Sequence, residues 1–230
     1  MYIDFHSHVL PGADHGSDSI EMSLSQLERA KEAGIDTIVA TPHFYPSKDD
    51  VEEFLARRER AYNELAKVNT TGIKIVKAAE VQLAVNVHET EGLEKLCIEG
   101  TNYILVEFPQ EPWPYWIFDS LTAIIREKRL RPVCAHIDRY SHIGRDRILS
   151  FNIDIQVNAS AFTDTRRRRN YYINLVSEDS VHLLGSDTHG DGKVSYKEFS
   201  VAAKKLGNYM PYITENANKI LASGEKNKSK

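Results

Sequence analysis

The sequence of 230 residues predicts an α/β protein whose parallel strands close into a distorted barrel of seven strands. Two observations predict this fold. Short runs of apolar and β-branched residues alternate with longer segments of helical periodicity, which is the order typical of a parallel sheet. Polar residues also stand at or just after the end of each of seven such runs. Because the ends of the strands converge on one rim of a parallel barrel, this distribution favours a barrel over an open sheet.

The expected strands occupy residues 2–8, 36–43, 73–81, 102–109, 131–137, 153–160 and 181–187. The expected helices between the early strands occupy residues 18–34, 51–68 and 116–130. In the first of these, Leu24, Leu27 and Ala30 keep helical spacing, and Gly34 follows where a helix commonly ends. A later helix is expected to begin near Ser195.

Composition and charge narrow the class of protein. No linker or low-complexity block divides the chain, so we expect residues 1–224 to form one domain and residues 225–230 a basic disordered tail. A net charge of −4 argues against a nucleic-acid partner. The arginines at 166–169 are interpreted as a solvated helix start, with a binding patch as the alternative. With no apolar span for a membrane, no signal peptide and only two cysteines, we expect a cytoplasmic protein without membrane insertion.

Imidazoles and carboxylates at the strand ends indicate a metal site. His6 and His8 lie at i and i+2 of a strand, so both project from the same face. Glu80 and Glu107 stand in apolar strands, where burying a carboxylate is costly without a cation or a partner. The full set of candidate ligands is His6, His8, Asp14, His43, Glu80, Glu107, His136, Asp187 and His189. Nine nitrogen and oxygen ligands exceed what one ion uses, so two or three clustered ions are expected, and the lack of thiolates argues against structural zinc.

A calcium-binding loop is the competing interpretation of the last motif. Counted from Asp187, the segment has Gly192 at the sixth and Glu198 at the twelfth position of an EF-hand loop. A helix must precede such a loop, whereas residues 181–187 indicate a strand. His189 also stands where calcium sites need an oxygen ligand. We therefore interpret Asp187 and His189 as ligands at a strand end.

Taken in order, the motifs DFHSHVLPGADHGSDS, ATPHF, AAEV, VEFP, AHIDRY, QVNASAF and GSDTHG resemble the polymerase-and-histidinol-phosphatase (PHP) superfamily. Within it, they are most similar to the metal-dependent tyrosine-protein phosphatases of bacterial capsule and exopolysaccharide gene clusters. The resemblance covers almost the whole chain and implies a TIM-like (β/α)7 barrel. It also implies a site for two to three metal ions, with manganese expected first and iron or zinc as alternatives.

The resemblance assigns the nine candidates above as metal ligands, with Glu80 bridging two ions and Arg139 binding phosphate. The sequence departs from the family at two places. The chain has Asp14, His15 and Gly16 where the family often has Asp-Asp-Gly. Lys193 stands where the family usually has a second arginine, and an ammonium group cannot make the bidentate contact of a guanidinium with phosphate.

The implied activity is hydrolysis of phosphotyrosine by a metal-bridged hydroxide, with Asp14, His15 and His43 as candidates for the group that protonates the leaving oxygen. The implied partner is a phosphotyrosyl protein, an autophosphorylated bacterial tyrosine kinase that controls polysaccharide synthesis. Alternatives are a histidinol-phosphate phosphatase or another phosphoesterase of the superfamily, or a binding module without catalysis. The oligomeric state is left open.

Two further groups of residues, the aromatic residues near the strand ends and the two cysteines, each allow more than one interpretation. Tyr45 and Trp113 either stack on a phosphotyrosine ring or pack the rim of the barrel, and Lys193 is a candidate substrate contact. A cysteine-based phosphatase requires Cys-x5-Arg. Only four residues separate Cys134 from Arg139, which excludes that chemistry.

Overall fold

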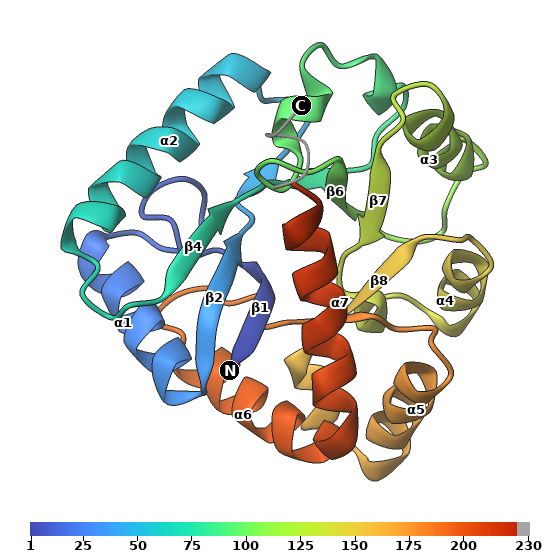
Figure 1. Ribbon diagram of the computed structural model, residues 1–230. Coiled ribbons are helices and arrows are strands. Elements are labelled where there is room, and N and C mark those ends of the chain that lie inside the picture. The colour runs from blue at the N-terminus through green and yellow to red at the C-terminus, as the bar shows by residue number, and fades with distance from the viewer. Residues whose placement is uncertain (225–230) are drawn as a thin grey trace.

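The computed structural model describes residues 1–224, so the tail expected at 225–230 lies outside the described residues. Strands and helices alternate along the chain (Figure 1). The strands are β1 (Tyr2–Ser7), β2 (Ile35–Ala40), β3 (His43–Phe44), β4 (Lys74–Lys77), β5 (Glu80–Gln82), β6 (Tyr103–Glu107), β7 (Arg131–Cys134), β8 (Asp154–Asn158) and β9 (Leu183–Gly185). The helices are α1 (Ile20–Glu32), α2 (Val51–Val68), α3 (Trp116–Arg126), α4 (His142–Leu149), α5 (Arg166–Ser177), α6 (Lys193–Leu206) and α7 (Met210–Ser223).

The strands form a curled parallel sheet in two hydrogen-bonded parts, β1-β2-β4 and β3-β5-β6-β7-β8-β9. The two parts are joined on both sides. On one side, β2 continues along the chain into β3 and β4 into β5, and between them the N–H of Ala78 donates to the carbonyl of Ala40 at 2.9 Å. On the other, the N–H of Asp187 donates to the carbonyl of His6 at 2.8 Å. The C-terminal ends of the strands therefore meet on one rim.

Two expected strands are each interrupted in the structure. Residues 36–43 divide into β2 and β3, and residues 73–81 divide into β4 and β5. Pro42 lies in the first interruption and has no N–H to donate to a neighbouring strand. Its carbonyl still accepts the N–H of Glu80 at 3.0 Å, so the strands stay aligned across the gap. The pattern of apolar runs did not reveal these breaks, nor did it reveal α7.

Apolar side chains fill the inside of the curl, and α7 packs across it. This inner cluster contains Ile3, Phe5, Val39, Val76, Leu105, Val133, Leu183, Ala217 and Ile220. A second cluster lies between the outer face of the strands and the helices that surround it (Figure 1). Side chains at N-cap positions fix where several helices begin. Ser19 accepts the N–H of Met22, and Asp50 accepts that of Glu53. None of the described helices is both long enough and apolar enough to cross a bilayer.

Candidate metal centre

The predicted ligands come together at the rim where the strands end. His6 lies in β1, His43 opens β3, Glu80 opens β5 and Glu107 closes β6. His136 follows β7, while Asp187 and His189 follow β9. Ligand atoms of seven predicted ligands form three groups in which every atom lies within 4.8 Å of the others: His6, His8 and Asp187; His8, His43 and His189; His43, Glu80 and Glu107. His136 belongs to none of these groups, but its Nε2 lies 2.8 Å from Oε1 of Glu80. These groups share His8 and His43, so they form one continuous cluster.

Glu80 is the hub of this cluster. Its Oε2 lies 3.2 Å from Nε2 of His6, 3.3 Å from Nε2 of His8 and 3.0 Å from Nδ1 of His43. Its Oε1 lies 2.8 Å from Nε2 of His136. The carboxylate is only 1% exposed, so four imidazoles rather than water surround it. This contact pattern suits a carboxylate that bridges two cations.

Asp187 and Glu107 extend the cluster on two sides. Oδ1 of Asp187 lies 3.4 Å from Nε2 of His8 and 3.7 Å from Nδ1 of His189. Oε1 of Glu107 lies 3.5 Å from Nε2 of His136. Several ligand types therefore face a common centre, and none of the described residues contributes a thiolate to it.

Unpaired buried atoms test whether these residues fit metal ions. Nε2 of His189 is buried and has no hydrogen-bond partner among the described residues. Nδ1 of His43 and Oε2 of Glu80 lie 3.0 Å apart but make no hydrogen bond, with each other or with any other described residue. A buried polar atom without a partner destabilises a protein by about 1–3 kcal/mol. Three such atoms in one cluster are explained if cations accept their lone pairs. The site therefore fits metal ions.

The carboxylates and imidazoles of the cluster shift one another's pKa values. Burial opposes ionisation of Glu80 and Asp187, but the surrounding imidazoles hold both pKa values well below the ordinary range. Both carboxylates are therefore ionised at neutral pH. Burial, together with the positive charge on His8, lowers the pKa of His189 to about 4, so its imidazole is neutral. Burial also opposes the charge on His8 and His136, but hydrogen bonds to neighbouring carboxylates raise the pKa of His8 well above its ordinary value and that of His136 to about 9. Because anionic carboxylates and neutral imidazoles are the forms that bind metals, these two imidazoles release protons when an ion binds.

Asp14 lies behind His8 and does not belong to any of the three groups of ligand atoms. Its Oδ2 is 2.7 Å from Nδ1 of His8 and accepts the N–H of His43 at 2.9 Å. Its Oδ1 accepts the N–H of Gly16 at 2.9 Å. In this position the carboxylate orients His8, as the outer carboxylate does in a carboxylate–histidine–metal arrangement. A direct role of Asp14 as a ligand stays a prediction.

Unusual backbone dihedral angles set the direction of two of these side chains. His136 has φ of 32° and Asp187 has φ of 49°, a left-handed conformation that is uncommon outside glycine and recurs at functional sites. Gly185 precedes Asp187 by two residues. A Cβ at Gly185 would lie 2.6 Å from Cβ of His6 and 2.6 Å from Nε2 of Gln156. Only glycine lets β9 approach this closely.

A cleft of about 440 Å³ opens beside the cluster, a size that suits a small organic ligand. Tyr45 and Arg139 both line it. The ring of Tyr45 stacks on His43 with centroids 5.3 Å apart, and the guanidinium of Arg139 donates to Oδ2 of Asp187. These two predicted substrate contacts therefore lie at the cluster.

The other two predicted substrate contacts lie in different surroundings. Trp113 packs against Phe108 and Tyr140, with ring centroids 5.1 and 5.3 Å away, and its Nε1 donates to the carbonyl of Pro109. Lys193 is the first residue of α6 and lines a separate groove, which lies between α6 and the loop that precedes α5. The structure does not bring either side chain to the cleft beside the cluster.

The sequence analysis missed Gln156, which lies in β8 and is fully buried. Its Oε1 lies 3.2 Å from Nδ1 of His6, and its Nε2 donates to Asn158 at 2.8 Å. Asn158 in turn donates to Oδ2 of Asp187 at 2.9 Å. The signal was present in the sequence, because a glutamine in the apolar run IDIQVN needs a buried partner.

His15 was named only as a candidate acid, yet its ring lies at the cluster. It stacks on His43 with centroids 4.7 Å apart and on His189 at 4.9 Å. His15 also lines the cleft. The imidazole that replaces the family's second aspartate therefore faces the same space as the predicted ligands.

Fold and site together define a parallel α/β protein with a cluster of histidines and carboxylates arranged to hold metal ions. The chain belongs to the CpsB/CapC family of capsular polysaccharide synthesis proteins, whose family model matches residues 2–222. Tyrosine-protein phosphatase YwqE of Bacillus subtilis (strain 168) is 27% identical over 95% of this chain and 91% of that protein.

Solved structures agree with this assignment. One described as from YwqE of Bacillus subtilis and CpsB of Streptococcus pneumoniae, unique metal-dependent tyrosine phosphatases, has a TM-score of 0.78 and 25% identity, covering 96% of this chain and 94% of that chain. Histidinol phosphate phosphatase from Lactococcus lactis, in complex with zinc, histidinol and phosphate, has a TM-score of 0.55 and 16% identity, covering 90% of this chain and 94% of that chain. The second likeness shows the shared fold alone.

Proposed function

We propose that this chain is a metal-dependent protein-tyrosine phosphatase that hydrolyses the phosphate ester of phosphotyrosine in the cleft beside Glu80. One observation carries the proposal: ring nitrogens of four histidines lie 2.8 to 3.3 Å from the buried Glu80 carboxylate. Such a cluster is a poor way to stabilise a fold, because apolar side chains of similar volume do so at least as well. The similarity to tyrosine-protein phosphatases supports the choice of substrate.

We infer that residues 1–224 form one domain in which the curled sheet works as a seven-stranded (β/α)7 barrel. In this interpretation β2 and β3 count as one interrupted strand, and β4 and β5 count as another. The backbone contacts between β1 and the segment after β9, including the bridge from Ser7 to Thr188, support closure. Closure places ligands from both ends of the chain on one rim.

Two to three ions fit the nine predicted ligands, and we assign manganese first, with iron or zinc as alternatives. A donor set of imidazoles and carboxylates without thiolate suits these ions. When bound, they act as Lewis acids and lower the pKa of water enough to supply a nucleophile near neutral pH. Gln156 and Asp14 hold His6 and His8 in orientation for this task.

Arg139 and Tyr45 are assigned to the substrate. A guanidinium presents two parallel N–H groups to phosphate oxygens, and Arg139 lies at the cleft beside Asp187. The ring of Tyr45 offers a face to the phenyl ring of phosphotyrosine. The leaving phenolate has a pKa of about 10, so it needs less help from an acid than an alkoxide does. Asp14, His15 and His43 are the candidates for that acid.

The proposed partner is a phosphotyrosyl protein in the bacterial cytoplasm, namely an autophosphorylated tyrosine kinase that controls polysaccharide synthesis. The family's link to capsular polysaccharide synthesis supports this partner. It also accounts for an aromatic residue at the cleft, which a phosphatase for small aliphatic esters does not need.

The test measures turnover of a phosphotyrosyl peptide after chelation and after reloading with manganese, iron or zinc. Glu80→Ala and His136→Ala are expected to abolish turnover and to remove bound metal, as measured by elemental analysis. Glu59→Ala, an exposed carboxylate on α2, serves as the matched control and keeps both. Turnover that resists chelation and both substitutions contradicts the proposal. Faster turnover of histidinol phosphate than of the peptide favours the alternative phosphatase.

A further inference from the structure

A second cavity lies away from the metal cluster. This groove, of about 580 Å³, runs between α6 and the loop that connects β8 to α5, where the 3-10 helix η4 (Ala159–Phe162) lies. Phe162, Val194 and Val201 supply its apolar lining. Val194 is 67% exposed, an unusual position for a valine at the start of a helix. We name this cavity the α6 groove. Its lining also includes four cations, Arg169, Lys193, Lys197 and Lys205.

The rim of the α6 groove is strongly cationic. Arg169, Lys193, Lys197 and Lys205 line it, and Glu198 is the one carboxylate among its lining residues. Among residues 1–224 none of the four cations makes an ion pair with a carboxylate. This concentration of unpaired positive charge stands out in a chain whose net charge is −4.

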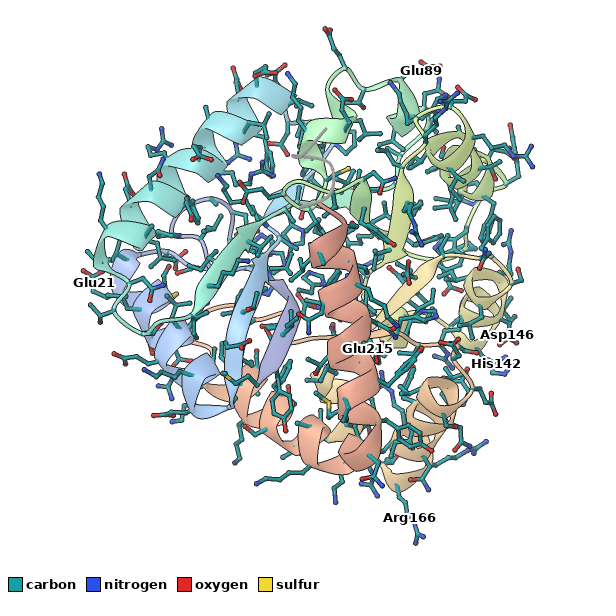
Figure 2. The ribbon with its side chains drawn as sticks, viewed as in Figure 1. Glu21, Glu89, His142, Asp146, Arg166 and Glu215 are labelled. Atoms are coloured by element: carbon teal, nitrogen blue, oxygen red, sulfur yellow. The ribbon has the colours of Figure 1, made fainter. Side chains whose placement is uncertain are left out.

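The single carboxylate is itself engaged. Oε1 of Glu198 accepts a hydrogen bond from Oγ1 of Thr163 at 3.2 Å, which ties α6 to the loop after η4. It therefore connects the two walls, and its single negative charge offsets one of the four positive charges, so the lining keeps a net charge of +3 (four less one). Arg166 is at the start of α5, and its side chain points away from the molecule and does not line the groove (Figure 2).

Both walls of the groove begin at residues of the metal site. Phe162 follows Asn158 by four residues, and Asn158 donates to Asp187. Lys193 follows His189 by four residues. Four residues of extended chain span at most about 14 Å. A peptide with its phosphotyrosine at the cleft therefore reaches the near end of the groove, at Phe162 and Lys193, within about four or five residues.

We propose that the α6 groove is a docking site for an acidic segment of the phosphotyrosyl substrate, lying about four to eight residues from the phosphotyrosine. The proposal rests on the proposed function and names the class of substrate that it favours. The four cations favour a segment that carries carboxylates, because the charges are complementary. The exposed Val194 adds an apolar contact that a peptide can make and a free inorganic anion cannot. The overall negative charge of the chain disfavours nucleic acid as the occupant.

The experiment compares a phosphotyrosyl peptide that carries three glutamates beginning four residues from the phosphotyrosine with its glutamine counterpart. Versions with the glutamates before and after the phosphotyrosine cover both directions of the chain. The double variant Lys197→Ala/Lys205→Ala is expected to raise KM for an acidic peptide about threefold to tenfold at low salt. The kcat and the turnover of p-nitrophenyl phosphate stay unchanged. The effect shrinks as salt rises, because the charges are exposed.

Lys67→Ala/Lys204→Ala is the matched control, since it removes two charges from exposed positions on α2 and α6 that do not line the groove. Equal KM values for acidic and glutamine peptides with the wild-type protein overturn the proposal. So does a groove variant that loses activity on p-nitrophenyl phosphate to the same extent as on peptide.

A binding measurement separates this proposal from the proposed function. Fluorescence anisotropy with a labelled acidic peptide without phosphotyrosine needs no turnover. Weaker binding by the groove variant than by the control supports the docking site even if no phosphatase activity is found. Equal binding by both variants overturns it, as does a single-stranded oligonucleotide that binds more tightly than the peptide.

Discussion

The side-chain oxygen of Gln156 accepts a hydrogen bond from the backbone N–H of His136 at 2.6 Å. The same oxygen lies 3.2 Å from Nδ1 of His6. One buried amide therefore orients two predicted ligands, and it requires the proton of His6 to be on Nδ1, which leaves Nε2 free for a metal. Gln156 does not reach the substrate, so it is a positioning residue.

Gln156→Leu is expected to weaken metal binding by about 10- to 100-fold, because it removes the shared acceptor and leaves the N–H of His136 unpaired. Competition with a chelator of known affinity measures this change. Val157→Ala alters the next residue of β8 and also loses buried contacts, but it is expected to change stability and not metal affinity. If both variants bind metal like the wild type, Gln156 has no positioning role.

Arg139→Ala is expected to lower kcat/KM for phosphotyrosine about 100- to 1,000-fold, the loss typical of removing one donor to a transition-state charge. Arg139→Lys is expected to recover little of it, because an ammonium cannot form the paired contact with phosphate. Steady-state kinetics with inorganic phosphate as a competing ligand provide the measurement. Arg126→Ala, at an exposed position of α3, is the control. An Arg139→Lys variant with full activity contradicts a bidentate role.

Tyr45→Ala is expected to raise KM for phosphotyrosine about 2- to 10-fold, the range of one aromatic stacking contact. KM for an aliphatic phosphate ester should not change, since that substrate has no ring. Tyr115→Ala is the comparison, because Tyr115 is 82% exposed and does not line the cleft. An equal effect of the two substitutions on phosphotyrosine means that Tyr45 does not contact the ring.

The two cysteines should be inert in the folded protein. Burial raises the pKa of the Cys97 thiol to about 12 and that of Cys134 well above its ordinary value. At pH 8 both thiols remain protonated, and the reactive thiolate is scarce. A thiol reagent at pH 8 is therefore expected to label neither cysteine rapidly until denaturant is added, and to leave activity intact.

The raised pKa of Cys97 makes the free energy of unfolding depend on pH. The unfolded thiol has a pKa of about 8.5. Because the folded pKa of Cys97 is raised to about 12, stability from the buried neutral thiol is fully present below pH 8.5 and is lost progressively as pH rises towards 12. Denaturant unfolding of the wild type and of Cys97→Ala between pH 8 and 10 measures it. A variant that declines as steeply as the wild type excludes Cys97 as a cause.

Much of the site could be predicted from the sequence. His6 lies in β1 and His8 directly follows its last residue, and their Nε2 atoms are 3.1 Å apart, in agreement with the expectation that both project from the same face. The rejection of an EF-hand was also correct, because β9 and not a helix precedes Asp187. These features depend on local periodicity, which a single sequence carries in full.

The fold was predicted in outline. Alternating strands and helices indicated the parallel α/β order. The sequence pattern did not predict that two strands are interrupted, one between β2 and β3 at Pro42 and the other between β4 and β5. The helix expected near Ser195 begins at Lys193, and the arginines at 166–169 do open a helix. Helix ends depend on hydrogen bonds to neighbouring loops as well as on propensity, so such boundaries are less certain than the existence of the element.

What the sequence by itself determined is therefore the order of the elements and the residue types that stand at the strand ends. Only the tertiary structure decided how those residues are used: Asp14 orients His8, Gln156 orients His6, and Lys193 lines the α6 groove. Gln156 and His6 are 150 positions apart, and a contact of that range arises only when the sheet curls. Local spacing sets the direction in which a side chain points, whereas packing of distant strands sets what it meets.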